Sequence, residues 1–479
     1  MYPEYSLYDL LEVENHPSLL EFKCAETDIL LWPMVRNYFF RFIIFDLMYG
    51  GQSVNQFPHR NYRVILPSIV KSVIHNFRHW HQNRSNIVIM TTGLGNVIQD
   101  GRWFNRLSDY FAMAARRETL TIEDLHEGRW PFPRHNPRVV FRTLMDLRGK
   151  IAGAILVSGK DESLSKKLIA MARYRAKNHL NWELGDKRSA ILSRYLARQI
   201  AAIPIRRRAY KRILARTGAR VVIKQLGCYG ISGVFNATAN DMGLVVAEYQ
   251  HGMISAGHDA YNVAPILIQN RLYKRMLPQF FLGYGQWWND QINMPVAKIA
   301  VGNPHRTEQL KRITGRKDIK SDILVLGDGY KTAVYLELAR NLSTGISKPF
   351  RVVFRPHPME REKLSALYSG NLLRDVHIDC NPDIYRSFCT AHAVVSEIST
   401  GLFEAVGLAD RVFLWNTYRA RFGYPTHPFA SFSDSRDLIE KLHNNHEGYV
   451  DFRKEDHIWS PNWRDNYLAF LNDIGGVAC

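Results

Sequence analysis

Short apolar runs that end in small or polar residues recur along the chain, and longer stretches with helical periodicity lie between them. The short runs predict strands over 86–93, 119–122, 219–224, 244–249, 280–283, 322–329, 351–354, 394–395 and 412–415. The longer patterns predict helices over 163–215, with a break at Pro204, and over 234–242, 331–342, 359–368, 400–407 and 435–443. The repeated order of strand, helix and strand is typical of parallel sheets.

The most apolar stretch of the chain covers residues 29–49 and is rich in Leu, Phe and Ile. It also carries Arg36, Arg41 and Asp46 and contains Pro33. Charged side chains inside a membrane span are costly, so this stretch is not expected to cross a bilayer. We expect a buried or interfacial helix instead.

The length of 479 residues, 46% of them hydrophobic, is too great for one ordinary core and favours two domains. A polar, basic connection over 303–321 separates two series of strands and helices. We therefore expect an α/β protein with an N-terminal domain over 1–302 and a second, nucleotide-binding domain over 303–430. A helical tail over 431–479 is expected to pack back across both.

The cysteines and the first residues indicate the compartment. The chain has five cysteines, an odd number, and none stands in a CxxC pair. This usage fits a reducing environment better than a disulfide framework or a zinc site. The N-terminus lacks the basic start and early apolar run of a signal peptide. A cytoplasmic protein is expected.

The net charge of +18 and the pI of about 9.6 call for an anionic partner. Basic residues concentrate over 71–84, 166–177 and 206–220. None of these stretches carries a zinc-finger or RNP motif, so nucleic acid is not expected as a partner. An anionic membrane surface and phosphorylated or acidic-sugar substrates are the remaining classes.

Membrane attachment would need apolar and cationic side chains on one surface. The segment 205–214 (Ile-Arg-Arg-Arg-Ala-Tyr-Lys-Arg-Ile-Leu) has this mixture, and Phe77 lies near Lys71 and Arg78 in the sequence. We expect a peripheral association of 205–214 with the inner face of the cytoplasmic membrane. The alternative is a solvated basic helix face, or one that attracts an acidic glycan.

Two predicted strand ends carry the side chains best suited to bind a ligand. One strand leads into the turn 355–358 (Arg-Pro-His-Pro), and another opens into a helix through 396–400 (Ser-Glu-Ile-Ser-Thr). In open α/β sheets, ligands bind beyond the carboxyl ends of the strands, and helix N-termini attract anions. The pattern predicts a pocket for a phosphorylated ligand.

These two motifs follow 250–252 (Gln-His-Gly) and 302–304 (Gly-Asn-Pro), and the order resembles the GT-B group of bacterial surface-polysaccharide enzymes. That group includes CDP-glycerol glycerophosphotransferases and the bacterial sialyl-, polysialyl- and Kdo-transferases. The resemblance covers about residues 221–415. It implies two facing Rossmann-type domains with a cleft between them, a nucleotide-activated sugar donor, and a polysaccharide or lipid-linked glycan acceptor.

Two departures from the glycerophosphotransferase pattern bear on the donor. Residues 397–400 read Glu-Ile-Ser-Thr in place of Asp-Tyr-Ser-Ser, and 327–329 read Gly-Asp-Gly in place of Pro-Thr-Trp. They favour a CMP-activated acidic sugar, such as sialic acid or Kdo, over glycerol phosphate. A polyol-phosphate transferase of the CDP-glycerol or CDP-ribitol type is the alternative with the same fold. A non-enzymatic nucleic-acid-binding or assembly protein is the alternative of another class.

On the donor side, His357 between two prolines is predicted to stabilise the departing phosphate. Arg355, expected on the same side of the strand, would supply a planar fork for that phosphate. The plainer readings are a turn histidine and an arginine in an ion pair.

Further donor-side candidates are Ser396, Ser399, Thr400 and Glu404. Ser399 and Thr400 could bind phosphate or only cap the helix, which requires the same residue types. The resemblance implies a ribose contact for Glu404, and a solvated helix glutamate is the alternative. Asp328, between two glycines, could bind the nucleotide or only form a turn.

On the acceptor side, His251 follows a strand and precedes Gly252, and the resemblance places it in the cleft as a candidate base. Gln250 beside it is expected to contact substrate. Glu123 and Asp124 end an N-terminal strand and are the rival base. The sequence contains no Asp-x-Asp motif, so no metal cofactor is expected.

Overall fold

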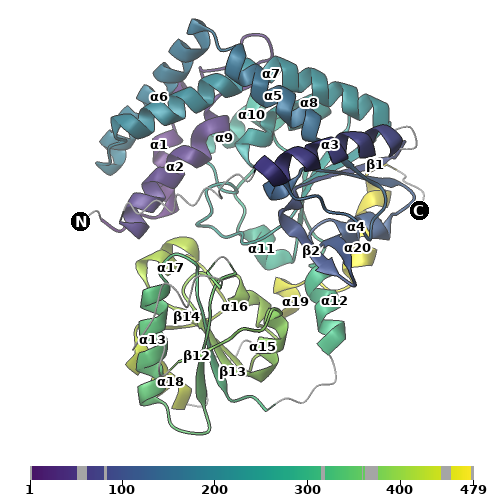
Figure 1. The fold of residues 1–479 in the computed structure, drawn as a ribbon. Helices are drawn as coiled ribbons and strands as arrows, with labels where there is room; N and C mark the ends of the chain where they lie inside the picture. The colour runs from purple at the N-terminus through teal and green to yellow at the C-terminus, as the bar shows by residue number, and fades with distance from the viewer. Residues whose placement is uncertain are drawn as a thin grey trace.

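The computed structural model describes residues 3–50, 62–79, 84–313, 319–358, 360–361, 376–443 and 455–475. Within these residues the chain forms one seven-stranded and one six-stranded sheet, and every strand pair in both sheets is parallel. Each sheet carries its own helices, and the two resulting units face each other in Figure 1. The predicted α/β fold with two parallel-sheet units is confirmed.

The first unit contains the sheet β5-β4-β1-β6-β7-β8-β9. Its strands are β1 (Ile87–Thr91), β4 (Thr119–Glu123), β5 (Val139–Phe141), β6 (Val221–Lys224), β7 (Val245–Tyr249), β8 (Phe280–Gly283) and β9 (Ala297–Ala300). Every residue of β1 is buried, as expected of a central parallel strand with helices over both faces. An antiparallel hairpin, β2 (Asn96–Gln99) and β3 (Arg102–Asn105), lies beside this sheet.

The helices of the first unit lie between these strands and before them. They are α1 (Leu7–Glu14), α2 (Trp32–Tyr49), α3 (Tyr62–His79), α4 (Asp109–Ala114), α5 (Thr143–Ile155), α6 (Gly159–Leu180), α7 (Asp186–Thr217), α8 (Gly233–Asp241), α9 (Pro265–Gln269), α10 (Arg271–Arg275), α11 (Gln286–Asp290) and α12 (Pro304–Ile313).

The second unit contains the sheet β12-β11-β10-β13-β14-β15. Its strands are β10 (Asp322–Leu326), β11 (Arg351–Arg355), β12 (His377–Ile378), β13 (Ala391–Ser396), β14 (Arg411–Trp415) and β15 (Ala430–Phe432). Its helices are α13 (Thr332–Gly345), α15 (Ile384–Thr390), α16 (Gly401–Glu404), α17 (Tyr418–Gly423) and α18 (Ser435–His443). The helix predicted over 359–368 falls mostly outside the described residues.

The prediction of one helix over 163–215 with a break at Pro204 is wrong. The break lies after α6, where Asn181 adopts a left-handed conformation with φ of 46°. The chain turns there because Trp182 and Leu184 are drawn into the core and are fully buried. Pro204 lies inside α7 and removes one backbone hydrogen bond from it. The packing of α7 against α5, α6 and α8 offsets that loss.

The apolar stretch over 29–49 forms α2, a helix that is largely buried, as predicted. Its Arg36 is 2% exposed and donates from Nε to Glu14 Oε2 over 2.7 Å. This pairing gives the helix's buried cation a partner, which the energetics of burial require. Among the described residues, no helix is long and apolar enough to cross a membrane.

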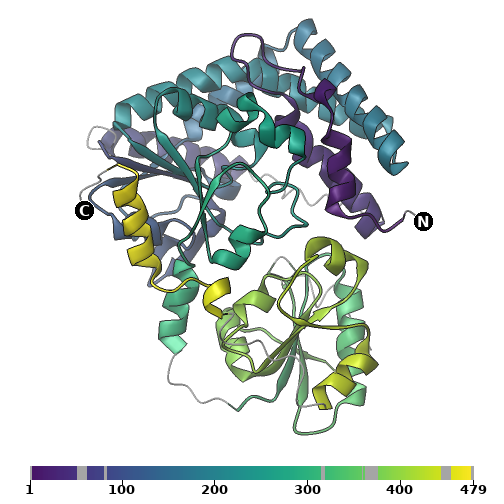
Figure 2. The same ribbon diagram turned by 180° about the vertical axis from the view of Figure 1, so that it is seen from behind.

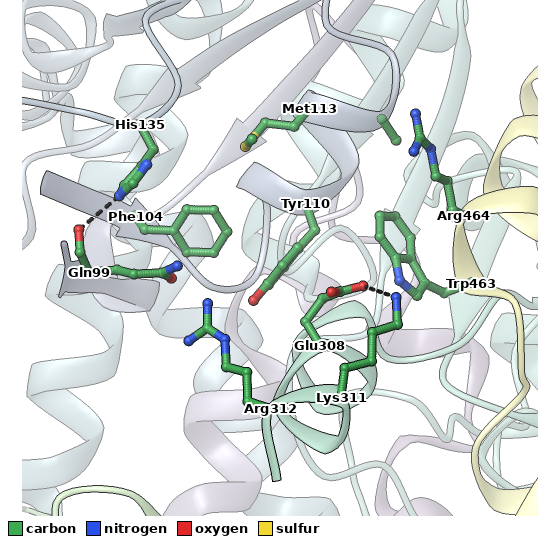
Figure 3. Close-up of a pocket in the computed structure, with 11 residues that line it drawn as sticks. Gln99, Phe104, Tyr110, Met113, His135, Glu308, Lys311, Arg312, Trp463 and Arg464 are labelled. Carbon is green, nitrogen blue, oxygen red and sulfur yellow. Dashed lines mark hydrogen bonds and ion pairs between the residues drawn. The ribbon is translucent and has the colours of Figure 1, made fainter. Parts of the chain in front are cut away.

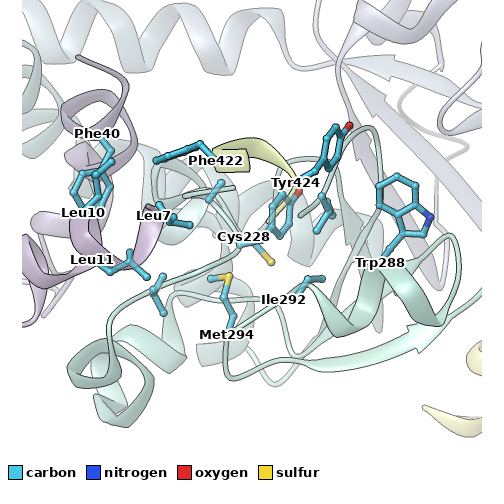
Figure 4. Close-up of a cluster of buried hydrophobic side chains, with 14 of the residues drawn as sticks. Leu7, Leu10, Leu11, Phe40, Cys228, Trp288, Ile292, Met294, Phe422 and Tyr424 are labelled. Atoms are coloured by element: carbon cyan, nitrogen blue, oxygen red, sulfur yellow. The ribbon is translucent and has the colours of Figure 1, made fainter. Parts of the chain in front are cut away.

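The two units are joined by a continuous apolar core. Phe403 of α16 stacks near Trp288 of α11, with ring centroids 4.5 Å apart, and Trp459 lies 5.7 Å from Trp288. Phe422 and Tyr424 of the second unit enter the same core, which Figure 4 shows between α1 and α11. The packing fixes how one sheet faces the other.

The C-terminal segment returns to the first unit. Helix α19 (Glu455–Ile458) packs on α11, and α20 (Trp463–Asp473) packs against α4. Tyr467 and Phe470 of α20 join the core above β1 and β7, and Figure 2 shows α20 in yellow alongside the first unit. The chain therefore crosses the boundary between the units twice.

Replacing Phe403 by Ala is expected to destabilise the protein by about 3–5 kcal/mol, because the fully buried ring fills the joint between the units. Urea denaturation measures this change. Phe77→Ala is the matched control, since Phe77 is 77% exposed and its loss should change stability by no more than about 0.5 kcal/mol. Equal effects of the two substitutions would contradict this account of the joint.

Candidate active site between the two sheets

A cavity lies between the units, beyond the carboxyl ends of β7 and β8. The second unit supplies three of its lining residues, from α15 and from the start and end of α16. The full lining is Arg106, Leu107, His251, Gly252, Tyr284, Trp288, Asn303, His305, Tyr385, Thr400, Glu404 and Trp459. The structure thus brings together three residues singled out in the sequence, namely His251, Thr400 and Glu404.

His251 enters this cavity from the turn after β7. Gln250, which is buried, holds the turn: its Nε2 donates to Gly252 O over 2.9 Å, and its Oε1 accepts from Tyr284 N over 2.8 Å. Gln250 is therefore a positioning residue in this structure. Burial, with a smaller contribution from the charge of His258, lowers the pKa of His251 to about 4. The imidazole is neutral at pH 7 and can accept a proton.

Beneath His251 lies Glu248, which is fully buried. Its carboxylate accepts from Cys228 N over 2.6 Å and from the Tyr261 hydroxyl over 2.8 Å, and burial raises its pKa. Glu248 Oε1 lies 3.7 Å from His251 Nδ1, and that nitrogen makes no hydrogen bond to the described residues. A proton on Nδ1 directed at this carboxylate leaves Nε2 as the basic nitrogen of the ring.

Arg106 supplies positive charge to the same cavity. Its side chain is exposed and makes no hydrogen bond or ion pair with the described residues. Burial first, and the charge of Arg106 second, lower the pKa of His305 to about 4. Arg106 was missed in the sequence because it stands on a loop after β3, outside any recognisable motif.

On the opposite wall, Thr400 and Glu404 present their side chains from α16. Thr400 is the N-cap of α16 but makes no side-chain capping bond to the described residues, and Ser399 Oγ before it accepts from Gly401 N over 3.1 Å. Ser396 is fully buried and donates to Leu326 O over 2.8 Å, so it joins β13 to β10 and does not face the cavity. Burial, with the nearby Glu404 charge, raises the pKa of Tyr385 well above its usual value.

Asp328 and Glu397, at the ends of β10 and β13, are held by a cation from another helix. Arg419 of α17 pairs with Asp328, and its Nη1 lies 3.1 Å from Glu397 Oε2. Asp328 Oδ1 also accepts from the backbone of Tyr330 and Lys331 over 2.8 and 2.9 Å, which is the turn role considered for it. Arg419 was missed because its partners lie far from it in sequence.

The structure separates Arg355 from His357. Arg355 is 5% exposed and pairs with Asp379, and its Nη1 donates to Ser387 Oγ over 3.0 Å. His357 lies two residues beyond β11, which ends at Arg355, so the two residues do not share one strand as predicted. His357 packs instead against Gly329, where an added Cβ would lie 3.1 Å from the imidazole. Burial lowers the pKa of His357.

The rival bases at the end of β4 are both occupied. Glu123 is fully buried, accepts from Arg134 Nη1 over 2.7 Å and from Asn105 Nδ2 over 3.1 Å. Asp124 pairs with Arg142 over 2.7 Å. Neither carboxylate lines the cavity between the units, so the structure does not bring them to His251.

A second cavity, of about 420 Å³, lies on the first unit behind the wall formed by His305. Tyr110 hydroxyl is 3.5 Å from His305 Nδ1, which places the two cavities side by side. Figure 3 shows the rings of Phe104, Tyr110 and Trp463 lining it together with Lys311, Arg312 and Arg464, and Lys311 Nζ lies 2.9 Å from Glu308 Oε1. Aromatic faces beside arginines suit an acidic saccharide.

Comparison with known proteins gives likenesses of fold. No protein-family model matches the chain, and no curated protein matches its sequence. Similar solved structures include UDP-GlcNAc 2-epimerase from Neisseria meningitidis (12% identity, 81% of this chain and 98% of that one, TM-score 0.39) and an H444N variant of the wall teichoic acid polymerase TagF (11%, 88% and 98%, 0.42). MurG from Acinetobacter baumannii is a third (10%, 75% and 90%, 0.40). At these identities and scores, no activity, substrate or residue role carries over.

Stability is expected to fall as pH drops from 6.5 towards 4. His251 and His305 have a pKa of about 4 in the folded protein and an ordinary value of 6.5. The unfolded chain therefore binds more protons in this window, and each added proton favours unfolding. Urea midpoints measured across it should decline less steeply in His251→Gln and in His305→Gln. His443→Gln, which removes an exposed imidazole, is the control and should keep the wild-type slope.

Proposed function

We propose that the protein is a glycosyltransferase that moves a sugar from a nucleotide donor to a glycan acceptor. The observation that carries this proposal is the cavity between the carboxyl ends of two parallel sheets, with a neutral histidine on one wall and Thr400 and Glu404 on the other. Parallel sheets bind nucleotides at this end of their strands, and transfer needs a base opposite the donor.

Residues of the first unit are proposed to carry out the proton transfer and to neutralise the leaving group. The acceptor hydroxyl loses its proton to His251 Nε2 as its oxygen attacks the anomeric carbon of the donor sugar. The bond between that carbon and the phosphate oxygen breaks, and the electron pair leaves with the nucleotide. Arg106, which pairs with none of the described residues, is the cation proposed to take up the phosphate charge. Glu248 orients His251 and stabilises the imidazolium once it forms.

The nucleotide portion is placed along the strand ends of the second unit. Glu404 is proposed to accept from the ribose hydroxyls, and Thr400 to contact the phosphate. His357, beyond the end of β11 and beside Gly329, remains a proposed donor contact. Asp328 is withdrawn from this set because Arg419 already pairs with it. Arg355 is withdrawn from this set because Asp379 already neutralises it.

For the donor we propose a CMP-activated acidic sugar, such as sialic acid or Kdo, on the motif departures and the net charge of +18. The acceptor is proposed to be a growing surface polysaccharide or a lipid-linked glycan, for which the second cavity offers aromatic faces beside arginines. A polyol-phosphate transferase is the alternative, since the same cation would serve its phosphate. Transfer is proposed to need no metal, because Arg106 can neutralise the leaving group.

A thermal-shift panel of CMP, CDP, UMP, UDP and GDP, run in EDTA, tests donor class and metal independence together. One cytidine nucleotide is expected to raise the melting temperature by mass action. Arg106→Ala should reduce that shift, whereas Arg102→Ala, an exposed arginine outside the cavity, should not. A shift that appears only when magnesium is supplied would contradict metal independence. No shift with any nucleotide would remove the transferase proposal.

Turnover is expected to fall at least about a hundredfold in His251→Gln, because the base for the acceptor proton is lost. Donor affinity in the same variant should stay near wild type, since the proposed nucleotide contacts are Arg106, Thr400 and Glu404 and do not include His251. His392→Gln is the matched control. The His392 side chain is 17% exposed, against 18% for His251, and His392 stands near the start of β13, at the end of that strand away from the cavity. Full activity in well-folded His251→Gln would exclude His251 as the base.

A further inference from the structure

Two adjacent helices of the first unit expose apolar side chains to solvent. On α3 these form one stripe at helical spacing, Leu66, Val70, Ile74 and Phe77, which are 59, 57, 47 and 77% exposed. On α5 a second stripe comprises Leu144, Leu147, Ile151 and Ile155, followed by Leu156, with 40–74% of each side chain exposed. Soluble proteins rarely expose contiguous apolar surface of this kind without a partner.

The charge of these helices is one-sided. Exposed Arg63, Lys71 and Arg78 stand on α3, and exposed Arg148 and Lys150 stand on α5. The described part of α3 contains no acidic residue. The one acid of α5, Asp146, is already matched, with its Oδ2 3.3 Å from Arg142 Nε.

The buried faces of both helices are committed to the fold, so the exposed stripes are their outer faces. On α3, His75 Nε2 bonds to Val139 O over 2.8 Å and Asn76 bonds to Phe141 of β5. On α5, Gly149 and Gly153 face α7 at close range. A side chain at Gly153 would not fit, because its Cβ would lie 2.5 Å from Arg198 O of α7. Helix α3 also packs alongside α5, so the two stripes lie on neighbouring helices.

Figure 1 shows both helices on the first unit, away from its boundary with the second. An occupant of this surface would therefore leave the cavity between the units open.

We propose that α3 and α5 form an interfacial docking surface for an anionic phospholipid membrane. Helices with an apolar stripe and cationic flanks lie in the headgroup region with the stripe in the acyl boundary, and basic residues are drawn to anionic lipid. A second copy of the chain would bring the same cations face to face, and a nucleic-acid backbone offers nothing to cover the leucines and isoleucines. The proposal is independent of the glycosyltransferase function.

Residues 205–214 are the segment that the sequence led us to expect on the membrane. Residues 205–214 lie in α7, where Tyr210 and Leu214 pack into the core beside β6. Arg206 bonds to Gln199 and Arg207 pairs with Asp241. Arg208, Lys211 and Arg212 of that segment are exposed, but its apolar side chains are buried or half-buried, so it offers no apolar surface.

Co-sedimentation of the full chain with vesicles tests the proposal. The protein is expected to bind vesicles that contain phosphatidylglycerol, to bind phosphatidylcholine vesicles much less, and to dissociate as salt is raised. The charge variant Lys71→Glu/Arg78→Glu should weaken binding by more than about tenfold, since each basic residue near an anionic surface contributes about fivefold. The apolar variant Phe77→Ser/Ile155→Ser should also weaken it.

Matched controls change the same residue types elsewhere. Ile319→Ser removes an apolar side chain that is 87% exposed at the start of the second unit, and Arg208→Glu reverses an exposed cation on α7. Both should bind vesicles as wild type does. Because all substituted side chains are exposed, circular dichroism should show unchanged folding. The proposal would be overturned if the α3 and α5 variants bound vesicles as wild type does. It would also be overturned if the protein bound no vesicles and instead showed self-association in light scattering that these variants abolish.

Discussion

The packing of Phe403 on Trp287 and Trp288 is the contact on which the candidate site depends. It holds α16 of the second unit against α11 of the first, and Arg306 reinforces it with a hydrogen bond to Val406 O over 2.6 Å. Because both sheets are parallel, their carboxyl ends carry the ligand-binding loops. The aromatic joint brings those ends together, so the cavity is a consequence of how the units pack.

Buried ion pairs then determine which charged groups remain for a ligand. Arg134 satisfies Glu123, and Arg419 satisfies Asp328 and Glu397. Each of these carboxylates is buried and already paired with an arginine, and none of them lines the cavity. Arg106 and His251 differ from these groups. Arg106 is exposed in the cavity and pairs with none of the described residues, and the imidazole of His251 is neutral because burial disfavours its charge.

The strands were predictable because a buried parallel strand needs a continuous apolar run, and β1, β6, β10 and β13 each have one. The cleft position of His251, Thr400 and Glu404 was also foreseeable from strand ends. Tertiary partners were not. The pairing of Arg355 with Asp379 spans a segment without a local signal, and the end of α6 at Asn181 depends on burial of Trp182. Arg106 lines the cavity only because the loop after the β2–β3 hairpin lies close to the second unit in the folded protein.

The nucleotide is proposed to bridge the two units at the cavity between the sheets. Hydrogen–deuterium exchange with and without a saturating cytidine nucleotide tests this bridging without an acceptor or turnover. Slower exchange is expected in two places at once, around Arg106 and Leu107 of the first unit and around residues 400–404 of the second. Protection confined to one unit, or located away from both segments, would contradict it.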